Sequence, residues 1–177
     1  MSDLFTESSS QWLNRDELES ARQRLPMLYV DAVPVRVDET GTVTAFGLLL
    51  RVSGDGEISR ALISGRVLYQ ERVRTALLRH LEKDLGPLAL PKLPAHPQPF
   101  TVAEYFPMRG VTPFHDARQH AVSLAYVVPV EGDCAPQQDA LELAWFTPEQ
   151  AADPEVQQAM AGGQGTLLRQ ALAVCGF

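Results

Sequence analysis

The chain has few of the features that mark secreted, membrane-spanning or nucleic-acid-binding proteins. It has only two cysteines, Cys134 and Cys175, which form no close pair and no metal-type spacing. No apolar run reaches the length of a membrane span, and the N-terminus lacks the basic start and apolar centre of a signal peptide. Basic residues are scarce, with 15 Lys and Arg against 22 Asp and Glu, so the net charge is −7. We therefore expect a reduced, cytoplasmic protein that binds neither membranes nor nucleic acid.

The composition is that of one folded domain. Apolar residues make up 45% and charged residues 21% of the 177-residue chain, which is typical of globular proteins. Residues 1–9 are polar, and we expect them to be disordered. Residues 10–177 are expected to form a single domain that includes an N-terminal helix.

Hydrophobic periodicity predicts a mixture of helices and strands. Helices are expected at 10–25, at 72–85, from 147 onward and at 166–175. Strands are expected at 28–37, 42–52, 101–108, 121–130 and 141–146, and a loop at 65–71. Pro34 predicts that the first strand lies at an edge or a bulge, and Asp31 is expected on the solvated face of that strand. This order predicts an α/β fold in which helices cover both faces of a mixed sheet.

One stretch, Gly65–Pro87, combines a loop, a helix and a dense set of charged residues in the sequence GRVLYQERVRTALLRHLEKDLGP. The apolar face of its helix is predicted to consist of Val73, Leu77, Leu81 and Leu85. Gly86 is expected to end the helix. The stretch therefore places polar and charged side chains on a helix whose other face packs in the core.

The spacing of residues in this stretch resembles the signature of the Nudix hydrolase superfamily. The glycine, glutamate, arginine and second glycine of that signature correspond to Gly65, Glu71, Arg79 and Gly86. The resemblance implies a Nudix-like α/β/α sandwich and gives these four residues a structural role in the motif. Glu71 and Arg79 are expected to form its internal ion pair.

The acidic part of the signature is altered. His80 stands where the family has the glutamate after the arginine, and Lys83 and Asp84 stand where it has a glutamate pair. The family's carboxylates bind Mg²⁺ or Mn²⁺, which clamp a diphosphate. The resemblance therefore implies that Asp84 is a metal ligand with help from His80. Because an ammonium beside the site repels a metal or binds phosphate itself, Lys83 predicts weak divalent-metal binding.

The resemblance extends beyond the motif. Residues 12–33 (WLNRDELESARQRLPMLYVDAV) are similar to the start of GDP-mannose mannosyl hydrolases, and residues 140–152 (ALELAWFTPEQAA) to the segment that closes many Nudix domains. The whole chain also resembles uncharacterised, actinobacterial-type Nudix-like proteins. This likeness covers nearly the whole chain from Trp12 onward.

A second polar cluster, His115–His120, lies directly before a predicted central strand. In the mannosyl hydrolase relatives a loop histidine acts as the base, so the resemblance implies that His115 or His120 could act as one here. Asp116 is a further candidate metal ligand. The candidate groups for holding a diphosphate or carboxylate are Arg51, Arg109 and Arg118.

Two functions fit these residues. The first is a divergent, metal-dependent Nudix hydrolase that cleaves a nucleoside diphosphate linked to another group, such as a nucleotide sugar. The second is a Nudix-fold module that binds or regulates without hydrolysis, since His80 and Lys83 remove two of the family's carboxylates. A homodimer that uses the N-terminal helix is a further alternative.

Overall fold

The computed structural model describes residues 12–52, 56–137 and 140–177. The expected disordered segment 1–9 and the helix start at residue 10 lie outside the described residues. The helices are α1 Arg15–Arg24, α2 Val73–Leu85, α3 Pro148–Ala151, α4 Pro154–Gln158, a 3₁₀ turn η1 Ala161–Gly163, and α5 Gln164–Val174. The strands are β1 Met27–Val37, β2 Val43–Val52, β3 Ile58–Ala61, β4 Ile63–Arg66, β5 Thr101–Tyr105, β6 Ala121–Pro129 and β7 Ala140–Phe146.

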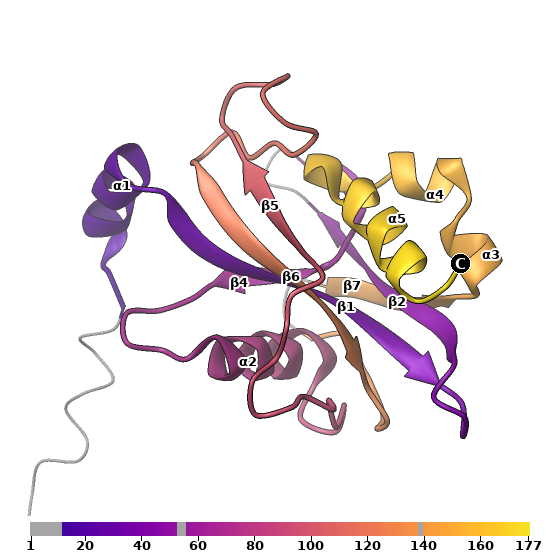
Figure 1. Ribbon diagram of the computed structural model, residues 1–177. Coiled ribbons are helices and arrows are strands. Elements are labelled where there is room, and N and C mark those ends of the chain that lie inside the picture. The colour runs from indigo at the N-terminus through magenta and orange to yellow at the C-terminus, as the bar shows by residue number, and fades with distance from the viewer. Residues whose placement is uncertain (1–11, 53–55, 138–139) are drawn as a thin grey trace, which may run out of the picture.

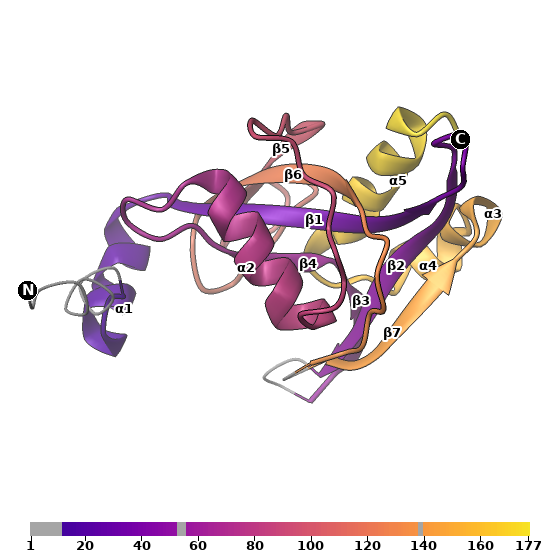
Figure 2. The same cartoon turned by 90° about the horizontal axis from the view of Figure 1, so that it is seen from below.

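The described strands form one mixed sheet of seven strands with helices on both faces (Figures 1 and 2). Its main path runs β3-β2-β1-β6-β5, with β4 also pairing with β1 and β7 with β2. Helix α2 lies on one face, and α3, α4 and α5 lie on the other. The predicted α/β/α sandwich with a mixed sheet is confirmed.

Strand β1 is central, which makes the edge position predicted from Pro34 wrong. β1 pairs in parallel with β6 from Met27–Ala121 to Val35–Pro129. On its other side it pairs with β4 as far as Ala32 and with β2 from Val35 onward. Pro34 lies in the gap between these two partners, where a missing N–H disrupts the ladder least.

Helix α2 docks through the face that its periodicity predicts. Leu77, Leu81 and Leu85 are fully buried, and Val73 packs partly buried beside them. Gly86 follows with a positive φ of 87°, a conformation that glycine adopts without strain. These contacts fix the helix against the sheet. They thereby also fix the positions of His80 and Asp84, which contact Arg66 and Arg51 of the neighbouring strands.

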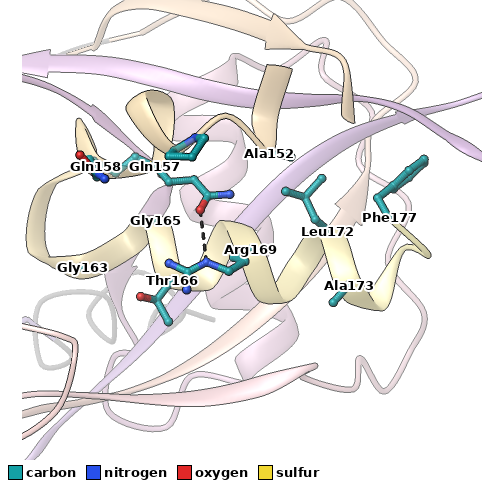
Figure 3. Close-up of a pocket in the computed structure, with 12 residues that line it drawn as sticks. Ala152, Gln157, Gln158, Gly163, Gly165, Thr166, Arg169, Leu172, Ala173 and Phe177 are labelled. Atoms are coloured by element: carbon teal, nitrogen blue, oxygen red, sulfur yellow. Dashed lines mark hydrogen bonds between the residues drawn. The ribbon is translucent and has the colours of Figure 1, made fainter. Parts of the chain in front are cut away.

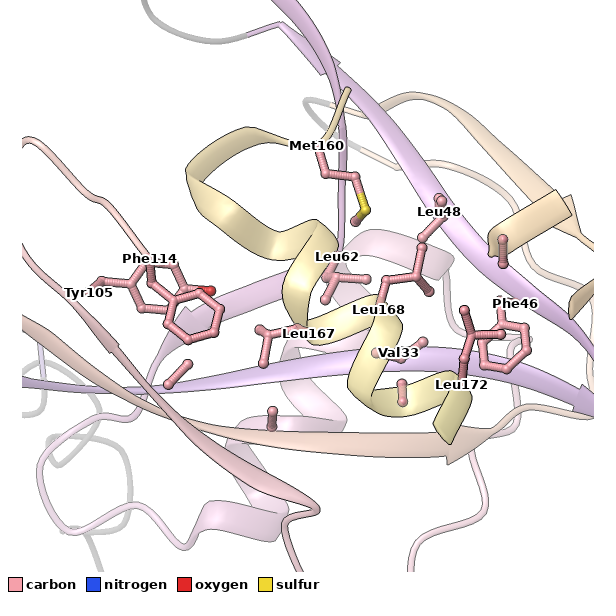
Figure 4. Packing of buried hydrophobic residues seen from close by; sticks show 14 of the residues in the cluster. Val33, Phe46, Leu48, Leu62, Tyr105, Phe114, Met160, Leu167, Leu168 and Leu172 are labelled. Atoms are coloured by element: carbon pink, nitrogen blue, oxygen red, sulfur yellow. The ribbon is translucent and has the colours of Figure 1, made fainter. Parts of the chain in front are cut away.

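The opposite face of the sheet is covered by α5 (Figure 4). Leu167, Leu168 and Leu172 pack there against residues such as Val33 and Phe46 of the sheet. Side chains of β1 alternate between this cluster and the one under α2, as the two-residue repeat of a strand requires. The sheet therefore has a hydrophobic core on each side.

Helix α1 is shorter and more exposed than predicted. It begins after Asn14, whose side chain accepts a hydrogen bond from the Glu17 N–H while Glu17 accepts one from the Asn14 N–H. None of its residues is buried, because RDELESARQR offers only Leu18 and Ala21 as apolar contacts. The strong cap therefore determines where this helix begins.

Candidate functional site

The loop before α2 is fixed by an ion pair between Glu71 and Arg79. The Arg79 guanidinium donates two hydrogen bonds of 2.8 Å to the carboxylate of Glu71 and a third, of 2.9 Å, to the Arg66 carbonyl. Glu71 also accepts a hydrogen bond from the Leu68 N–H. Burial alone raises the pKa of Glu71, but these hydrogen bonds lower it below its usual value. The ion pair expected between the two residues is present, and it ties the loop to the helix.

His80 lies against Gly65 on β4. A Cβ atom at Gly65 would lie 1.9 Å from Cε1 of the imidazole, so only glycine leaves room for this ring. Nε2 of His80 lies 3.0 Å from the Arg66 carbonyl, which can only accept, so Nε2 carries the proton. Burial lowers the pKa of His80, and none of the described residues forms a hydrogen bond with its buried Nδ1. The ring is therefore held in one orientation at the wall of the site.

Asp84 is bound by two cations. Its Oδ2 lies 2.6 Å from Nη2 of Arg51 on β2, and its Oδ1 lies 3.7 Å from Nζ of Lys83. The Asp84 side chain is only 1% exposed, whereas those of Arg51 and Lys83 are 24% and 33% exposed. The carboxylate expected to ligate a metal is thus enclosed in an ion-pair cluster at the end of α2.

Arg51, His80 and Lys83 line a cleft of about 820 Å³, a size suited to a nucleotide-like ligand, and Asp84 lies behind Arg51 and Lys83 outside the lining. Its walls come from all the described strands except β7, from α2, from the 106–120 loop, from η1 and from the start of α5. Among the described residues that line it, the basic ones are Arg51, Arg66, Lys83, Arg109 and Arg118. The acidic lining among the same described residues consists of Asp116 alone. The cleft is therefore a positively charged region of a protein whose net charge is −7.

Asp116 itself is neutralised by a neighbour. Arg118 donates two hydrogen bonds of 2.9 Å to its two carboxylate oxygens, and Gln119 donates one of 2.8 Å. Burial alone raises the pKa of Asp116, but these bonds hold it below its usual value. Arg22 of α1 donates to the Gln119 side chain at 3.0 Å, which connects the N-terminal helix to this rim of the cleft. Asp116 thus has a positioning role for Arg118 in this geometry.

The three candidate histidines have different surroundings. His115 lines the cleft together with His80. His120 is not among the described lining residues; its ring stacks on Phe106 with centroids 4.4 Å apart, and its Nε2 is buried without a hydrogen-bond partner. Of the two loop histidines, His115 is therefore the one placed to meet a ligand.

Several polar residues of the cleft floor and of the strand below it were not predicted as site residues from the sequence. Tyr105 and Gln164 line the cleft, and Tyr105 donates a hydrogen bond of 3.1 Å to Asp31 below it. Asp31, expected on a solvated face, is fully buried at the centre of β1. Burial raises the pKa of Asp31. Burial also raises the pKa of Tyr105, and the neighbouring Asp31 raises it further. The available signal in the sequence was a charged residue within an apolar strand. Such a residue can lie on a solvated face or in the interior, and Asp31 is buried because β1 is a central strand.

A second hollow of about 670 Å³ lies beside α4 and α5 (Figure 3). Arg169 donates a hydrogen bond of 3.2 Å to Gln157 across it, and Leu172 and Phe177 also line it. The described residues of its lining include none of the predicted site residues. Most of the predicted site residues line the larger, basic cleft instead.

The charged groups of the cleft do not suit a divalent metal. Mg²⁺ prefers several oxygen ligands, but Lys83 is a cation and the carboxylates of Asp84 and Asp116 are each paired with an arginine. Within residues 12–52, 56–137 and 140–177, no group of three or more His, Cys, Asp and Glu side chains is placed to hold a metal ion. As arranged, the described residues do not fit a resident Mg²⁺.

Comparisons with known proteins agree with this fold. The family described as a domain of unknown function (DUF4916) matches residues 8–177. A structure from Jonesia denitrificans DSM 20603, described as possible asymmetric diadenosine tetraphosphate (Ap4A) hydrolases, is 67% identical with a TM-score of 0.84, covering 86% of this chain and 96% of that one. No curated protein matches the chain.

More distant structures share the fold. The Nudix domain of Shewanella oneidensis NrtR, solved with ADP-ribose, is 18% identical with a TM-score of 0.61, covering 92% of this chain and 99% of that one. A MutT Nudix hydrolase from Burkholderia pseudomallei is 18% identical with a TM-score of 0.58, over 83% and 98% of the two chains.

The sandwich fold, the helix with its preceding loop and these likenesses define a Nudix superfamily protein. Within it, the chain belongs to the DUF4916 family. A search of the described helices for one both long enough and apolar enough to span a membrane finds none.

Proposed function

We propose that this chain is a Nudix-type hydrolase that binds a nucleotide derivative with a diphosphate or longer phosphate chain. The observation that carries the proposal is the cleft itself, in which basic side chains outnumber a single, arginine-paired carboxylate among the described residues. Phosphate oxygens are the ligand groups that such a surface binds best. The Jonesia denitrificans structure, described as possible Ap4A hydrolases, and the ADP-ribose complex of NrtR support this ligand class.

In this proposal His115 is the base. It takes a proton from a water molecule whose oxygen forms the new bond to phosphorus. The bond between phosphorus and the bridging oxygen breaks, and the leaving phosphate keeps the electron pair. Arg109 and Arg118 are suited to stabilise the negative charge that develops on the phosphate oxygens. No step is assigned to a divalent metal, because the described residues do not fit one as arranged.

A module that binds nucleotides without cleaving them is the second candidate. The observation in its favour is that Asp84, which stands at one of the glutamate positions of the Nudix signature, forms ion pairs with Arg51 and Lys83. Binding and cleavage therefore have to be measured separately.

The test combines calorimetry with product analysis by ion-exchange chromatography. Ap4A, ADP-ribose and GDP-mannose are each incubated with the protein with and without Mg²⁺. We expect binding and cleavage of at least one compound, and a loss of kcat of roughly 10²-fold or more in His115→Gln with KM changed less than about threefold. The control is Lys92→Met, since Lys92 pairs with Glu131 and is outside the lining of the cleft.

Two results would contradict the hydrolase. Binding of every compound without any product would establish the binding module instead. Full activity of His115→Gln would remove His115 from the reaction while leaving the ligand class intact.

A further inference from the structure

The charged cluster of Arg51, Lys83 and Asp84 at the end of α2 differs in net charge from the acidic residues of the Nudix signature. Two cations, Arg51 and Lys83, approach the two oxygens of one carboxylate, so the three side chains together carry a positive charge. Both cations also line the cleft. At this end of α2 the protein thus presents positive charge where the signature presents negative charge.

The guanidinium of Arg51 is only partly used by Asp84. Its Nε and Nη2 atoms are buried, and neither has an aligned hydrogen-bond acceptor among the described residues, although Nη2 lies close to Asp84. A buried donor without an aligned acceptor is destabilising, so the Arg51 guanidinium keeps unused capacity to donate hydrogen bonds. The Arg51 side chain also lines the cleft and is 24% exposed, so its accessible part is available to a ligand oxygen, and an anion would be bound most strongly.

We propose that Arg51 and Lys83 form a phosphate-binding subsite at the position where an intact Nudix signature would hold a divalent cation, with Asp84 positioning Arg51. This rests on the proposed function in one respect, that the phosphate belongs to the bound nucleotide derivative. The two cations neutralise phosphate oxygens directly, and the planar fork of Arg51 can donate to two oxygens at once. Phosphate binding at this subsite therefore does not require Mg²⁺.

The test is calorimetric titration of inorganic pyrophosphate in the presence of EDTA. We expect wild type to bind, and Lys83→Met and Arg51→Lys each to weaken the Kd at least fivefold. Lys83→Met removes one of the two cations, and Arg51→Lys keeps the charge but loses the bidentate fork. Lys92→Met, a charge deletion outside the cleft, should stay within twofold of wild type.

A charge reversal makes the test sharper. Lys83→Glu should weaken pyrophosphate binding more than tenfold in EDTA, and addition of Mg²⁺ should restore part of it, because a second carboxylate now stands beside Asp84. Thermal melts by circular dichroism identify any variant that fails to fold. Lys83 is the safer position in that respect, since its side chain is one-third exposed.

Either of two results would overturn the subsite. One is wild-type binding of pyrophosphate only when Mg²⁺ is present. The other is unchanged binding in folded Lys83→Met and Arg51→Lys together with loss of binding in Arg109→Met, which would place the anion at the other rim. Pyrophosphate binding as expected, without turnover of any nucleotide, would leave the subsite standing and refute the hydrolase alone.

Discussion

Asp31 lies at the centre of β1 with no exposed surface, and the Tyr105 hydroxyl donates a hydrogen bond to it. Burial raises its folded-state pKa above the ordinary value of 3.8. The unfolded chain therefore releases this proton at a lower pH than the folded protein does. As the pH rises from about 4 to the folded-state pKa, Asp31 progressively lowers the free energy of unfolding.

Replacing this acid should stabilise the protein in a pH-dependent way. We expect Asp31→Asn to melt at a higher temperature than wild type at pH 7, with the difference shrinking toward pH 4. The amide keeps an acceptor for Tyr105 but has no proton to lose. Each kcal/mol gained raises the Tm of a chain of this length by roughly 2–4 °C. Thermal melts at pH 4, 5, 6 and 7 measure the effect.

Asp38 supplies a control of opposite sign. Hydrogen bonds from Thr40 and from the Thr42 N–H lower its pKa in an exposed turn. Asp38→Asn should therefore lower the Tm at pH 7, and less so at low pH. A lower Tm for Asp31→Asn at pH 7 would mean that the carboxylate is ionised in the folded protein.

At the residue scale, sequence spacing identifies partners that are close along one motif. Glu71 and Arg79 lie eight positions apart in a loop and the helix after it, and their ion pair follows from the signature. The signature does not predict the ion pair between Arg51 and Asp84, because Arg51 lies outside the motif, on strand β2, and only the folded sheet brings it to α2. The sequence predicted that Arg51 holds a diphosphate or carboxylate and that Asp84 ligates a metal, but not that the two residues pair with each other.

At the scale of elements, α2 is held by its buried leucines. Leu81→Asp should abolish cooperative folding, because it removes a fully buried side chain and places a charge in the core, at a cost of several kcal/mol. Glu82→Ala on the exposed side of the same helix is the matched control, and its Tm should stay within a few degrees of wild type. Circular dichroism melts compare the two.

An unchanged melting curve for Leu81→Asp would mean that α2 does not pack as described. A moderate version, Leu81→Ala, should lower the free energy of unfolding by about 2–5 kcal/mol. Urea unfolding at one temperature measures that value directly.

Most long elements could be predicted, whereas the short strands β3 and β4 could not. The periodicity of α2 and the apolar run of β6 extend over enough residues to be distinctive. Strands β3 and β4 have four residues each, and β4 falls partly inside a stretch expected to be a loop. The place of β1 at the centre of the sheet depends on partners distant in sequence, so Pro34 alone suggested the wrong position.

At the scale of the whole molecule, charge is distributed unevenly. The net charge is −7, yet the charged residues in the described lining of the cleft are basic except for Asp116. Such a region attracts phosphate-bearing ligands, and salt screens this attraction over a Debye length of about 10 Å at 0.1 M.

We expect the Kd for the nucleotide derivative that binds best to rise at least fivefold between 50 and 300 mM NaCl, because screening weakens the attraction of the basic cleft for phosphate. Calorimetry at the two salt concentrations measures this change. A Kd independent of salt would show that contacts other than the basic side chains dominate binding. Lys92→Met should show the same salt dependence as wild type, since Lys92 is outside the cleft.

The parallel pairing of β1 with β6 has a consequence for how this chain is made on the ribosome. Met27 pairs with Ala121, so about 90 residues have to be synthesised after β1 begins before its neighbour exists. At 5–20 residues per second this leaves roughly 5–20 s in which an apolar strand has one side of its backbone unpaired. Nascent chains of this protein are therefore expected to need protection by chaperones during that interval, until β6 emerges and closes the centre of the sheet.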